Sequence, residues 1–215
     1  AKNHEGYRNL MELTSIAHVE GFYYRPRIDK ELLSEKYNGL IALSGCLGGE
    51  LCELIQKGEL EKAKENIAWY VKNFGDENFY IEVQDHPESS AQNSANQVLF
   101  QLSREMGVPI VLTKDFHYLH RDDAIAQDAL LCVYQGKIVE DKNRLCMMDM
   151  DLHMTTPEEV FENWSGPMEA IENTARIADA CTLELELGKW HFPSVQIPSG
   201  KTAEDELRYQ TFEGA

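Results

Sequence analysis

Two kinds of apolar segment alternate along this chain. Five longer segments have the composition and spacing of helices with one packed side, at residues 7–22, 59–75, 90–107, 122–136 and 167–181. Among them lie three short apolar runs that we expect to form buried strands, at residues 39–45, 79–85 and 108–115. Strands separated by helices predict an α/β fold with parallel strands, either an open sheet or a (β/α) barrel.

The rest of the chain consists of connecting segments and further helix signals. Residues 138–156 show no regular pattern, and Thr156 and Pro157 then have the types expected for the N-cap and the first residue of a helix. Residues 191–215 contain prolines and then a helical stretch, as in a linker into another domain. The chain does not begin with Met, and we expect it to be a piece of a longer protein.

Each predicted strand ends in a residue type that can bind metal ions. Cys46 follows the first strand and His86 follows the second, while Asp115 ends the third and His117 lies two residues beyond it. In parallel α/β folds the carboxyl ends of the strands lie on one face, where active sites form. Asp115 and His117 are two residues apart, so extended backbone would point both to the same side. Phe116, between them, would then point into the packing.

Cysteine, histidine and carboxylate together are typical ligands of zinc or a similar transition ion, and such ions can activate water to hydrolyse a phosphate ester. Structural alternatives stay open for each residue. Cys46 could be a small buried side chain, and His86 could be a surface residue of a polar loop. We expect His120 and His153 to be solvated and without partners. Glu82 alternates with apolar neighbours and is left unassigned.

Charge and cysteine content restrict the classes of function. The net charge of −17 repels phosphate backbones, which disfavours a nonspecific nucleic-acid clamp unless metal ions or a neighbouring domain offset it. The five cysteines form no CxxC pair, which argues against a disulfide framework and for a reducing, cytoplasmic location. No apolar run is long enough to span a membrane. Walker, GxGxxG and GxSxG motifs are absent, so nucleotide-loop and serine-hydrolase chemistry have no support.

Residues 21–30, GFYYRPRIDK, combine aromatic side chains with Arg25, Arg27 and Lys30. Such a composition could hold phosphate. A turn between two helices, with the tyrosines packed on the core, explains the segment at least as well.

Several longer stretches resemble one known family. They are EGFYYRPRIDKELL, GLIALSGCLGGEL, FYIEVQDH, VPIVLTKDFHYLHRDDAIAQDALLC and AIENTARIADACTLELELGKWHFP. In order and spacing they resemble the bacterial DNA polymerase III alpha subunits, over the C-terminal part of the N-terminal PHP (polymerase and histidinol phosphatase) domain. The resemblance implies a partial, distorted (β/α) barrel of the PHP type for residues 1–190. Residues 191–215 would be a helical extension and linker into the polymerase palm region.

The PHP domain of this family can hold a cluster of metal ions at its strand ends. By resemblance, Cys46 corresponds to the ligand in the LSGC motif, and Asp115 and His117 correspond to the final DxH pair. No ligand role carries over to His86. The other ligands lie upstream and the polymerase aspartates downstream, so no catalytic residue is assigned and the isolated segment is expected to be inactive. The implied metals are zinc or manganese here, and magnesium in the parent polymerase.

The resemblance implies DNA-templated DNA synthesis in chromosome replication by the whole subunit. This segment would contribute part of a multi-metal site for 3′–5′ exonuclease proofreading or for structural stabilisation. Two alternatives are a free-standing metal-dependent PHP phosphoesterase and a non-enzymatic docking module for a proofreading subunit. Expected partners are DNA, through the full-length protein, and the sliding clamp, proofreading subunit and clamp loader. Missing barrel strands would leave open edges, so the segment could self-associate.

Overall fold

The computed structural model describes residues 1–190 and 192–214. By its internal contacts the chain divides into two units, Ala1–Leu183 and Glu184–Ala215. His191, the first residue of the predicted extension, lies outside the described residues.

Three strands form the sheet of the first unit in the order β1–β2–β3, all parallel. They are β1 (Ala42–Leu43), β2 (Phe79–Gln84) and β3 (Ile110–Thr113). The register pairs Ala42 with Phe79, and Ile81 with Ile110. The predicted parallel α/β class is confirmed, although each strand is shorter than the apolar run that predicted it. The described strands form an open sheet, and closure into a barrel stays a prediction.

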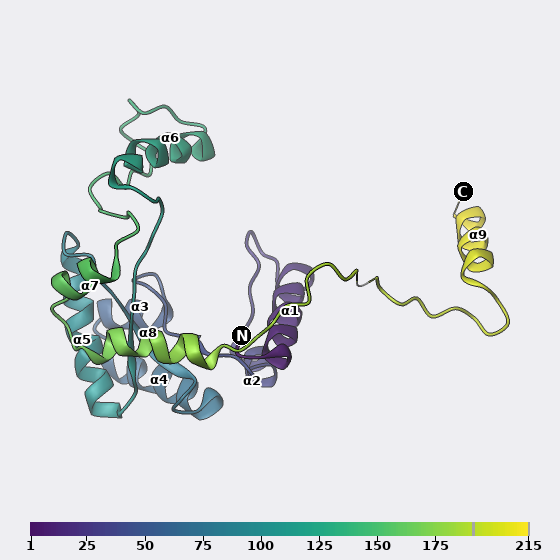
Figure 1. Ribbon diagram of the computed structural model, residues 1–215, viewed down its shortest axis with the longest axis horizontal. Coiled ribbons are helices and arrows are strands. Elements are labelled where there is room, and N and C mark those ends of the chain that lie inside the picture. The colour runs from purple at the N-terminus through teal and green to yellow at the C-terminus, as the bar shows by residue number, and fades with distance from the viewer. Residues whose placement is uncertain (191, 215) are drawn as a thin grey trace. The chain divides into compact units, whose positions relative to one another are not determined.

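Helices occur along the whole described chain (Figure 1). They are α1 (His4–Val19), α2 (Lys30–Glu35), α3 (Glu50–Gln56), α4 (Leu60–Phe74), α5 (Ser90–Met106), α6 (Ala124–Gln135), α7 (Pro157–Asn163), α8 (Glu169–Ala180) and α9 (Ala203–Glu213), with a 3-10 helix at Arg121–Asp123. Every segment predicted to be helical contains a helix. None of the described helices has the length and apolar character of a membrane span.

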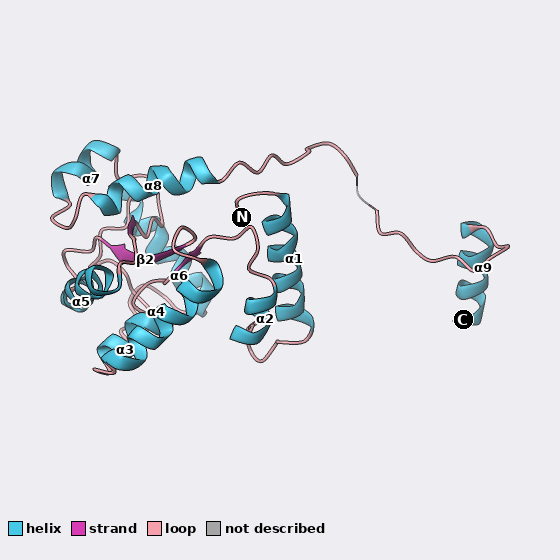
Figure 2. Ribbon diagram, turned by 90° about the horizontal axis from the view of Figure 1, so that it is seen from below, coloured by secondary structure: helices cyan, strands magenta, loops and turns pink. Residues whose placement is uncertain are grey.

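The core lies around β2, where both faces of the sheet are covered. Ile81 and Val83 of β2, Ile67 of α4 and Leu99 of α5 have no exposed surface. In Figure 2, α7 and α8 lie on one side of the strands, and α3, α4 and α5 lie on the other. A strand that is covered on both faces reads as a continuous apolar run. Glu82 is the β2 residue that stays half-exposed.

The start of α7 confirms the predicted cap. Thr156 accepts a hydrogen bond from the backbone nitrogen of Glu159 at 3.2 Å, and the Glu159 carboxylate accepts one from the Thr156 nitrogen at 2.7 Å. Pro157 is the first helical residue. No helix or strand is assigned to the described residues 138–156, as predicted, although His153 forms an isolated bridge with Tyr118.

The segment between α1 and α2 is a loop, as one of the two interpretations of residues 21–30 required. Its tyrosines do not pack on the core, because Tyr23 and Tyr24 are both exposed. That part of the prediction is wrong.

In the second unit, the described residues before α9 form no helix or strand, and α9 lies at the C-terminal, yellow end of Figure 1. Thr202 opens the helix by accepting a hydrogen bond from the backbone nitrogen of Asp205 at 3.2 Å. The helical end predicted for the extension is therefore present.

Candidate functional site

The ends of all three strands line one cavity of about 160 Å³. Cys46 contributes from the end of β1, His86 from the end of β2 and Asp115 from the end of β3. The other lining residues are Leu47, Gln84, Ser89, Gln92 and Met150. The parallel sheet thus brings together three of the four ligand-type residues that the sequence placed at strand ends. His117 does not line this cavity.

Cys46 lies where the chain turns away from β1. Gly45 has a φ of +82°, a conformation that favours glycine. The Cys46 carbonyl then accepts a hydrogen bond from the Gly49 nitrogen at 2.8 Å, just before α3. The Cys46 side chain is exposed, so its interpretation as a small buried residue is wrong. The Cys46 thiol is therefore accessible from solvent.

His86 is buried, with 4% of its surface exposed, and its assignment to the protein surface is wrong. Its Nδ1 is buried without a hydrogen-bond partner. Burial lowers the pKa of the imidazole, while the charge of Asp115 acts in the opposite direction. A neutral imidazole with an unpaired buried nitrogen is costly unless a water, an ion or a ligand satisfies it. The sequence signal for His86 was its position at a strand end.

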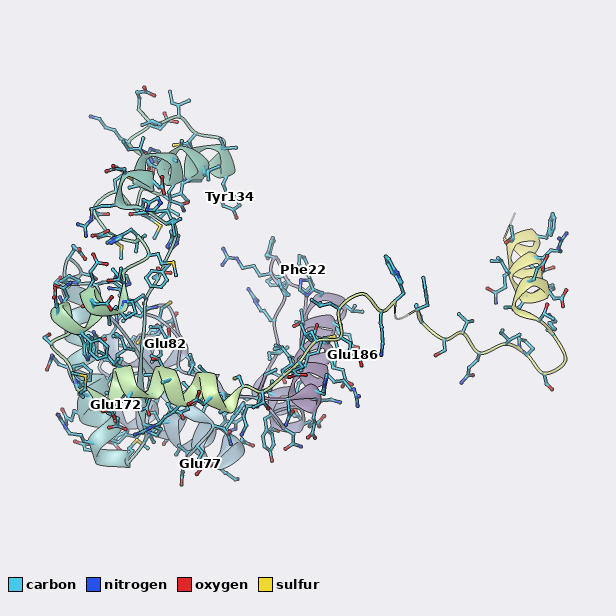
Figure 3. The ribbon with its side chains drawn as sticks, in the orientation of Figure 1. Phe22, Glu77, Glu82, Tyr134, Glu172 and Glu186 are labelled. Atoms are coloured by element: carbon cyan, nitrogen blue, oxygen red, sulfur yellow. The ribbon has the colours of Figure 1, made fainter. Side chains whose placement is uncertain are left out.

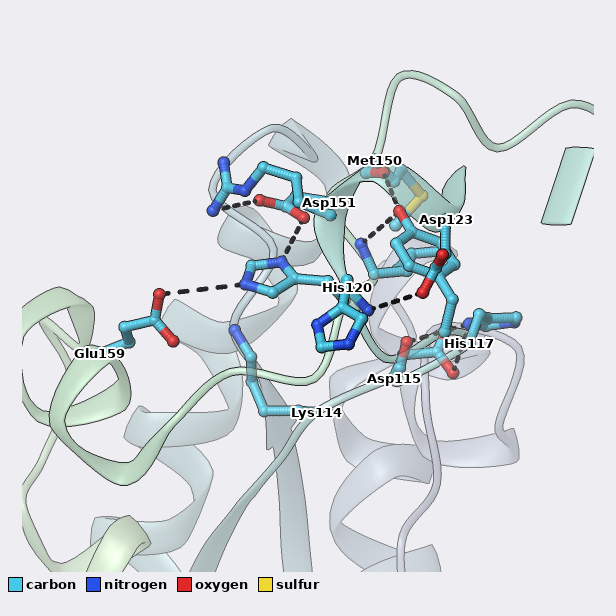
Figure 4. Close-up of polar contacts among 12 residues, drawn as sticks. Lys114, Asp115, His117, His120, Asp123, Met150, Asp151 and Glu159 are labelled. Carbon is cyan, nitrogen blue, oxygen red and sulfur yellow. Dashed lines mark hydrogen bonds and ion pairs between the residues drawn. The ribbon is translucent and has the colours of Figure 1, made fainter. Parts of the chain in front are cut away.

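Asp115 and His117 adopt a different geometry from the predicted one, because β3 ends at Thr113. The Nδ1 of His117 lies 2.9 Å from the Asp115 carbonyl oxygen and 3.7 Å from Asp115 Oδ1, and Figure 4 shows the two side chains together. The backbone nitrogen of His117 donates to the Leu152 carbonyl at 2.9 Å. Phe116 is 44% exposed instead of packed as predicted.

The His117 contact decides which of its ring nitrogens is free. A carbonyl oxygen can only accept a hydrogen bond, so Nδ1 must carry the proton in this contact. In the neutral ring, Nε2 then keeps its lone pair, which is the arrangement that metal-binding histidines commonly use. His117 is thus in a tautomer suited to binding a metal through Nε2.

Glu82 links the strand ends from within the sheet. Its Oε1 accepts a hydrogen bond from Thr113 Oγ1 at 2.6 Å, and its backbone nitrogen donates to Ser44 Oγ at 2.9 Å. A second link joins β2 to β3, because Lys114 Nζ lies 3.1 Å from Asp85 Oδ2. These contacts hold the ends of β1, β2 and β3 in fixed relation around the cavity. Figure 3 shows where Glu82 lies within the first unit.

His153, expected to be solvated, is instead buried and paired. Its Nδ1 lies 2.6 Å from Asp151 Oδ1, and its Nε2 lies 4.0 Å from Glu159 Oε1. Arg121 Nη2 lies 2.9 Å from Asp151 Oδ2. His120 is exposed, as expected, but has a partner in Asp123, whose Oδ2 accepts from the His120 backbone nitrogen at 3.0 Å (Figure 4). The contacts of Asp151 and His153 join the segment before α7 to the 3-10 helix that contains Arg121.

The donor set fits part of a metal site. Among the residues that the structure describes, no group of three or more histidine, cysteine, aspartate or glutamate side chains is arranged to hold a metal ion. Cys46, Asp115 and the unpaired His86 nitrogen nevertheless share one cavity. Their chemistry suits zinc or manganese better than calcium. The described residues thus bring donor types that suit such an ion to one cavity, and among these residues no complete set of ligands is formed.

Comparison with known proteins identifies relatives of the chain. The PHP domain family matches residues 1–86. The DNA polymerase III subunit alpha of Borreliella burgdorferi is 42% identical over 216 residues, and that of Deinococcus radiodurans is 39% identical over 225 residues. The DNA polymerase III subunit alpha of Thermus aquaticus is 38% identical over 224 residues.

Each of these three alignments covers 100% of the chain but only 16% to 19% of the relative. The chain thus spans less than a fifth of the length of these relatives. Residues 87–215 lie outside the PHP match and still align with the polymerase subunits. Over its full length the chain is therefore homologous to one segment of DNA polymerase III alpha subunits, and its residues 1–86 match the PHP domain family.

Proposed function

We propose that this chain is a segment of a replicative DNA polymerase alpha subunit, and that its strand-end cavity forms part of a divalent-metal site acting on phosphoester bonds. The whole parent would add nucleotides to a primer on a DNA template, with magnesium as its metal. Identity of 38% to 42% across the full chain supports this assignment. No residue of this chain is assigned to nucleotide addition, and the segment by itself would be inactive.

One observation carries the metal-site proposal: Cys46, His86 and Asp115 come from three different strand ends and line one cavity. Cys46 and Asp115 would supply a thiolate and a carboxylate, and His117 would supply Nε2 after a modest reorientation towards them. Zinc or manganese held there would polarise a phosphate ester and make a bound water more acidic. The protein would hold these donors in fixed positions, because Glu82 links the strand ends and the Leu152 carbonyl binds the backbone of His117.

The accessibility of the donors favours a catalytic role over a structural one. Structural zinc sites enclose the ion with four protein ligands, whereas catalytic sites keep an open position. Cys46 is exposed and Asp115 is half-exposed. We therefore propose 3′–5′ exonuclease proofreading in the parent protein, with structural stabilisation as the alternative.

The test compares metal content and hydrolysis in the full-length parent protein. Cys46→Ser, Asp115→Asn and His117→Ala are each expected to lower bound zinc or manganese and to slow removal of a mismatched primer terminus. His18→Ala is the matched control, because the His18 ring is exposed and its Nδ1 also contacts a backbone carbonyl, at 2.8 Å from Thr14. Unchanged metal content in all three variants would refute the metal site. Metal loss without any loss of hydrolysis would assign a structural role.

The same protein separates the remaining alternatives. A free-standing phosphoesterase would turn over small phosphate esters such as histidinol phosphate, and a docking module would bind a proofreading subunit without hydrolysis. The alignment of residues 87–215 with polymerase subunits supports the polymerase proposal over the former. We propose DNA, the sliding clamp, the clamp loader and a proofreading subunit as partners of the parent. The net charge of −17 suits protein surfaces of opposite charge.

A further inference from the structure

The loop between α1 and α2 exposes aromatic rings that have no place in the core. Phe22 is 59% exposed and Tyr24 is 83% exposed. Figure 3 shows Phe22 on the loop that projects beyond α1. Aromatic side chains bury large apolar areas when they find partners. Adjacent exposed rings on a projecting loop therefore mark a contact surface.

The backbone of this loop is held in one shape. The Tyr23 nitrogen donates to the Arg25 carbonyl at 3.1 Å. A side chain at Gly21 would collide with the Arg27 carbonyl, so the two ends of the loop touch. Tyr24 has a φ of +59°, and among the described residues it is the non-glycine residue with positive φ. Strain of this kind persists where the surrounding structure holds it, and it is common at functional sites.

The aromatic and cationic side chains of the loop are arranged together. The Tyr23 and Tyr24 rings meet edge to face at 4.7 Å, and the Arg27 guanidinium lies 5.5 Å from the centre of the Tyr23 ring. Such contacts restrict the side chains before any partner arrives. A preorganised surface loses less entropy on binding.

The charge of the loop is opposite to that of the chain. Residues 21–28 carry Arg25 and Arg27 and no acidic residue, whereas the net charge is −17. Neither arginine pairs with a carboxylate within the described part of the chain, while Lys30 is already paired with Glu50 at 2.8 Å. Two unpaired guanidinium groups next to exposed rings favour a ligand with both negative charge and flat apolar faces.

We propose that residues 21–28 bind single-stranded nucleic acid, with Phe22 and Tyr24 stacking on bases and Arg25 and Arg27 contacting phosphates. Rings that stack on bases, together with cations that follow the backbone, are the usual means of binding single strands. A protein partner could also use aromatic and arginine side chains, but two unpaired guanidinium groups beside exposed rings favour a polyanion with flat bases, and they act locally against the repulsion that the net charge of −17 exerts on phosphates. The proposal refines the proposed function by placing a substrate contact, and it does not depend on the metal site.

The test measures binding of a fluorescent oligothymidylate by fluorescence anisotropy, with the full chain and with EDTA present. Removing metal ions separates this result from any failure of the metal-site proposal. The double variant Phe22→Ala/Tyr24→Ala is expected to weaken binding by about tenfold or more, since base stacking contributes strongly for each ring. Tyr24→Phe keeps the ring face and should retain the affinity. An oligomer with abasic sites should be insensitive to the loss of the rings.

The arginines are tested through salt dependence. Arg25→Gln/Arg27→Gln should reduce the slope of log affinity against log salt by about 1.4, because each phosphate contact contributes about 0.7 on single strands. Tyr134→Ala/Lys137→Gln is the matched control, since Tyr134 is 86% exposed on α6 and Lys137 is exposed beside it. Equal loss in this control, unchanged binding in the loop variants, or no binding by the unaltered chain would each overturn the proposal.

Discussion

The side-chain nitrogen of Asn173, on α8, donates a hydrogen bond of 2.6 Å to the backbone carbonyl of Ile110, on β3. Asn173 is 1% exposed, and its oxygen accepts from Arg176 at 2.9 Å. The amide therefore satisfies one polar group of the strand that leads to Asp115. Because β3 has one strand neighbour in the described sheet, a helix side chain here takes part in holding the strand in place.

Asn173→Leu should destabilise the protein by about 1–3 kcal/mol, because it leaves a buried carbonyl without a donor. Urea unfolding followed by circular dichroism measures the change. Asn9→Leu is the control, since the Asn9 amide donates to the Asn38 carbonyl at 2.9 Å on the exposed surface. It should cost much less, because water can replace that bond. An equal decrease in the free energy of unfolding in the two variants would show that burial of the hydrogen bond does not determine how much its loss destabilises the protein.

The two neighbouring thiols Cys46 and Cys52 should react very differently. Burial, with smaller effects of Cys46 and Glu82, raises the pKa of the Cys52 thiol to about 11. About one Cys52 in a thousand is then a thiolate at pH 8, and the thiolate is the reactive form. Iodoacetamide should therefore modify the exposed Cys46 and spare Cys52, as mass spectrometry of the peptides would show.

Zinc added before alkylation should protect Cys46 if it is a ligand. Cys181 is the control, because it is exposed and lies in no candidate site. Equal protection of Cys46 and Cys181 would argue that zinc acts nonspecifically, and no protection of either would count against Cys46 as a ligand.

The sequence could predict that the residues after the three strands lie on one edge of the sheet, because parallel strands all run in the same direction. Three apolar runs separated by helices were enough to place Cys46, His86 and Asp115 on one edge. The finer geometry was not predictable from spacing. The rule that residues two apart share a side holds only in extended backbone, and β3 ends two residues before Asp115. Consequently His117 contacts the Asp115 carbonyl and stays outside the cavity.

Burial of the histidines depends on contacts that are distant in sequence. His86 is followed by polar residues, but Cys46, Asp115 and Met150, which lie far from it along the chain, line the cavity with it. His153 forms a backbone bridge with Tyr118, and its partner Asp151 pairs with Arg121. Tyr118 and Arg121 both lie far earlier in the chain. The polar sequence neighbours of both histidines therefore led to the wrong prediction that their side chains are exposed. The Thr156 cap, in contrast, is a local interaction, and its prediction was correct.

Asp151 should make stability depend on pH in the acid range. Burial alone would raise the pKa of this carboxyl, but the hydrogen bond from His153 and the charge of Arg121 outweigh it and lower the pKa below its ordinary value of 3.8. The unfolded state then binds more protons than the folded state near pH 3.8. The stabilisation is present above that pH and is lost as the pH falls towards the folded-state pKa.

Asp151→Asn should remove this part of the pH dependence. Urea unfolding at a series of pH values around 3.8 measures the slope of stability against pH. Asp149→Asn is the control, because Asp149 is exposed and only two residues away. A slope that is flattened equally in both variants would show that general charge repulsion, and not the His153 contact, governs acid unfolding.

We predict that tyrosine at position 24 makes the folded protein less stable than glycine would at the same position. A left-handed backbone costs a non-glycine residue roughly 1–2 kcal/mol, and glycine avoids this cost. Glycine in turn loses about 0.5–1 kcal/mol through its greater freedom in the unfolded chain. Tyr24→Gly is therefore expected to leave stability unchanged or raise it by up to about 1.5 kcal/mol, while Tyr23→Gly, at a residue without positive φ, should lower it. The two rings contact each other, so either variant loses that contact, and Tyr23→Gly also loses the contact with the Arg27 guanidinium. Thermal unfolding measures both effects, and an equal loss in the two variants would mean that the Tyr24 ring stabilises the loop by more than its strained backbone costs.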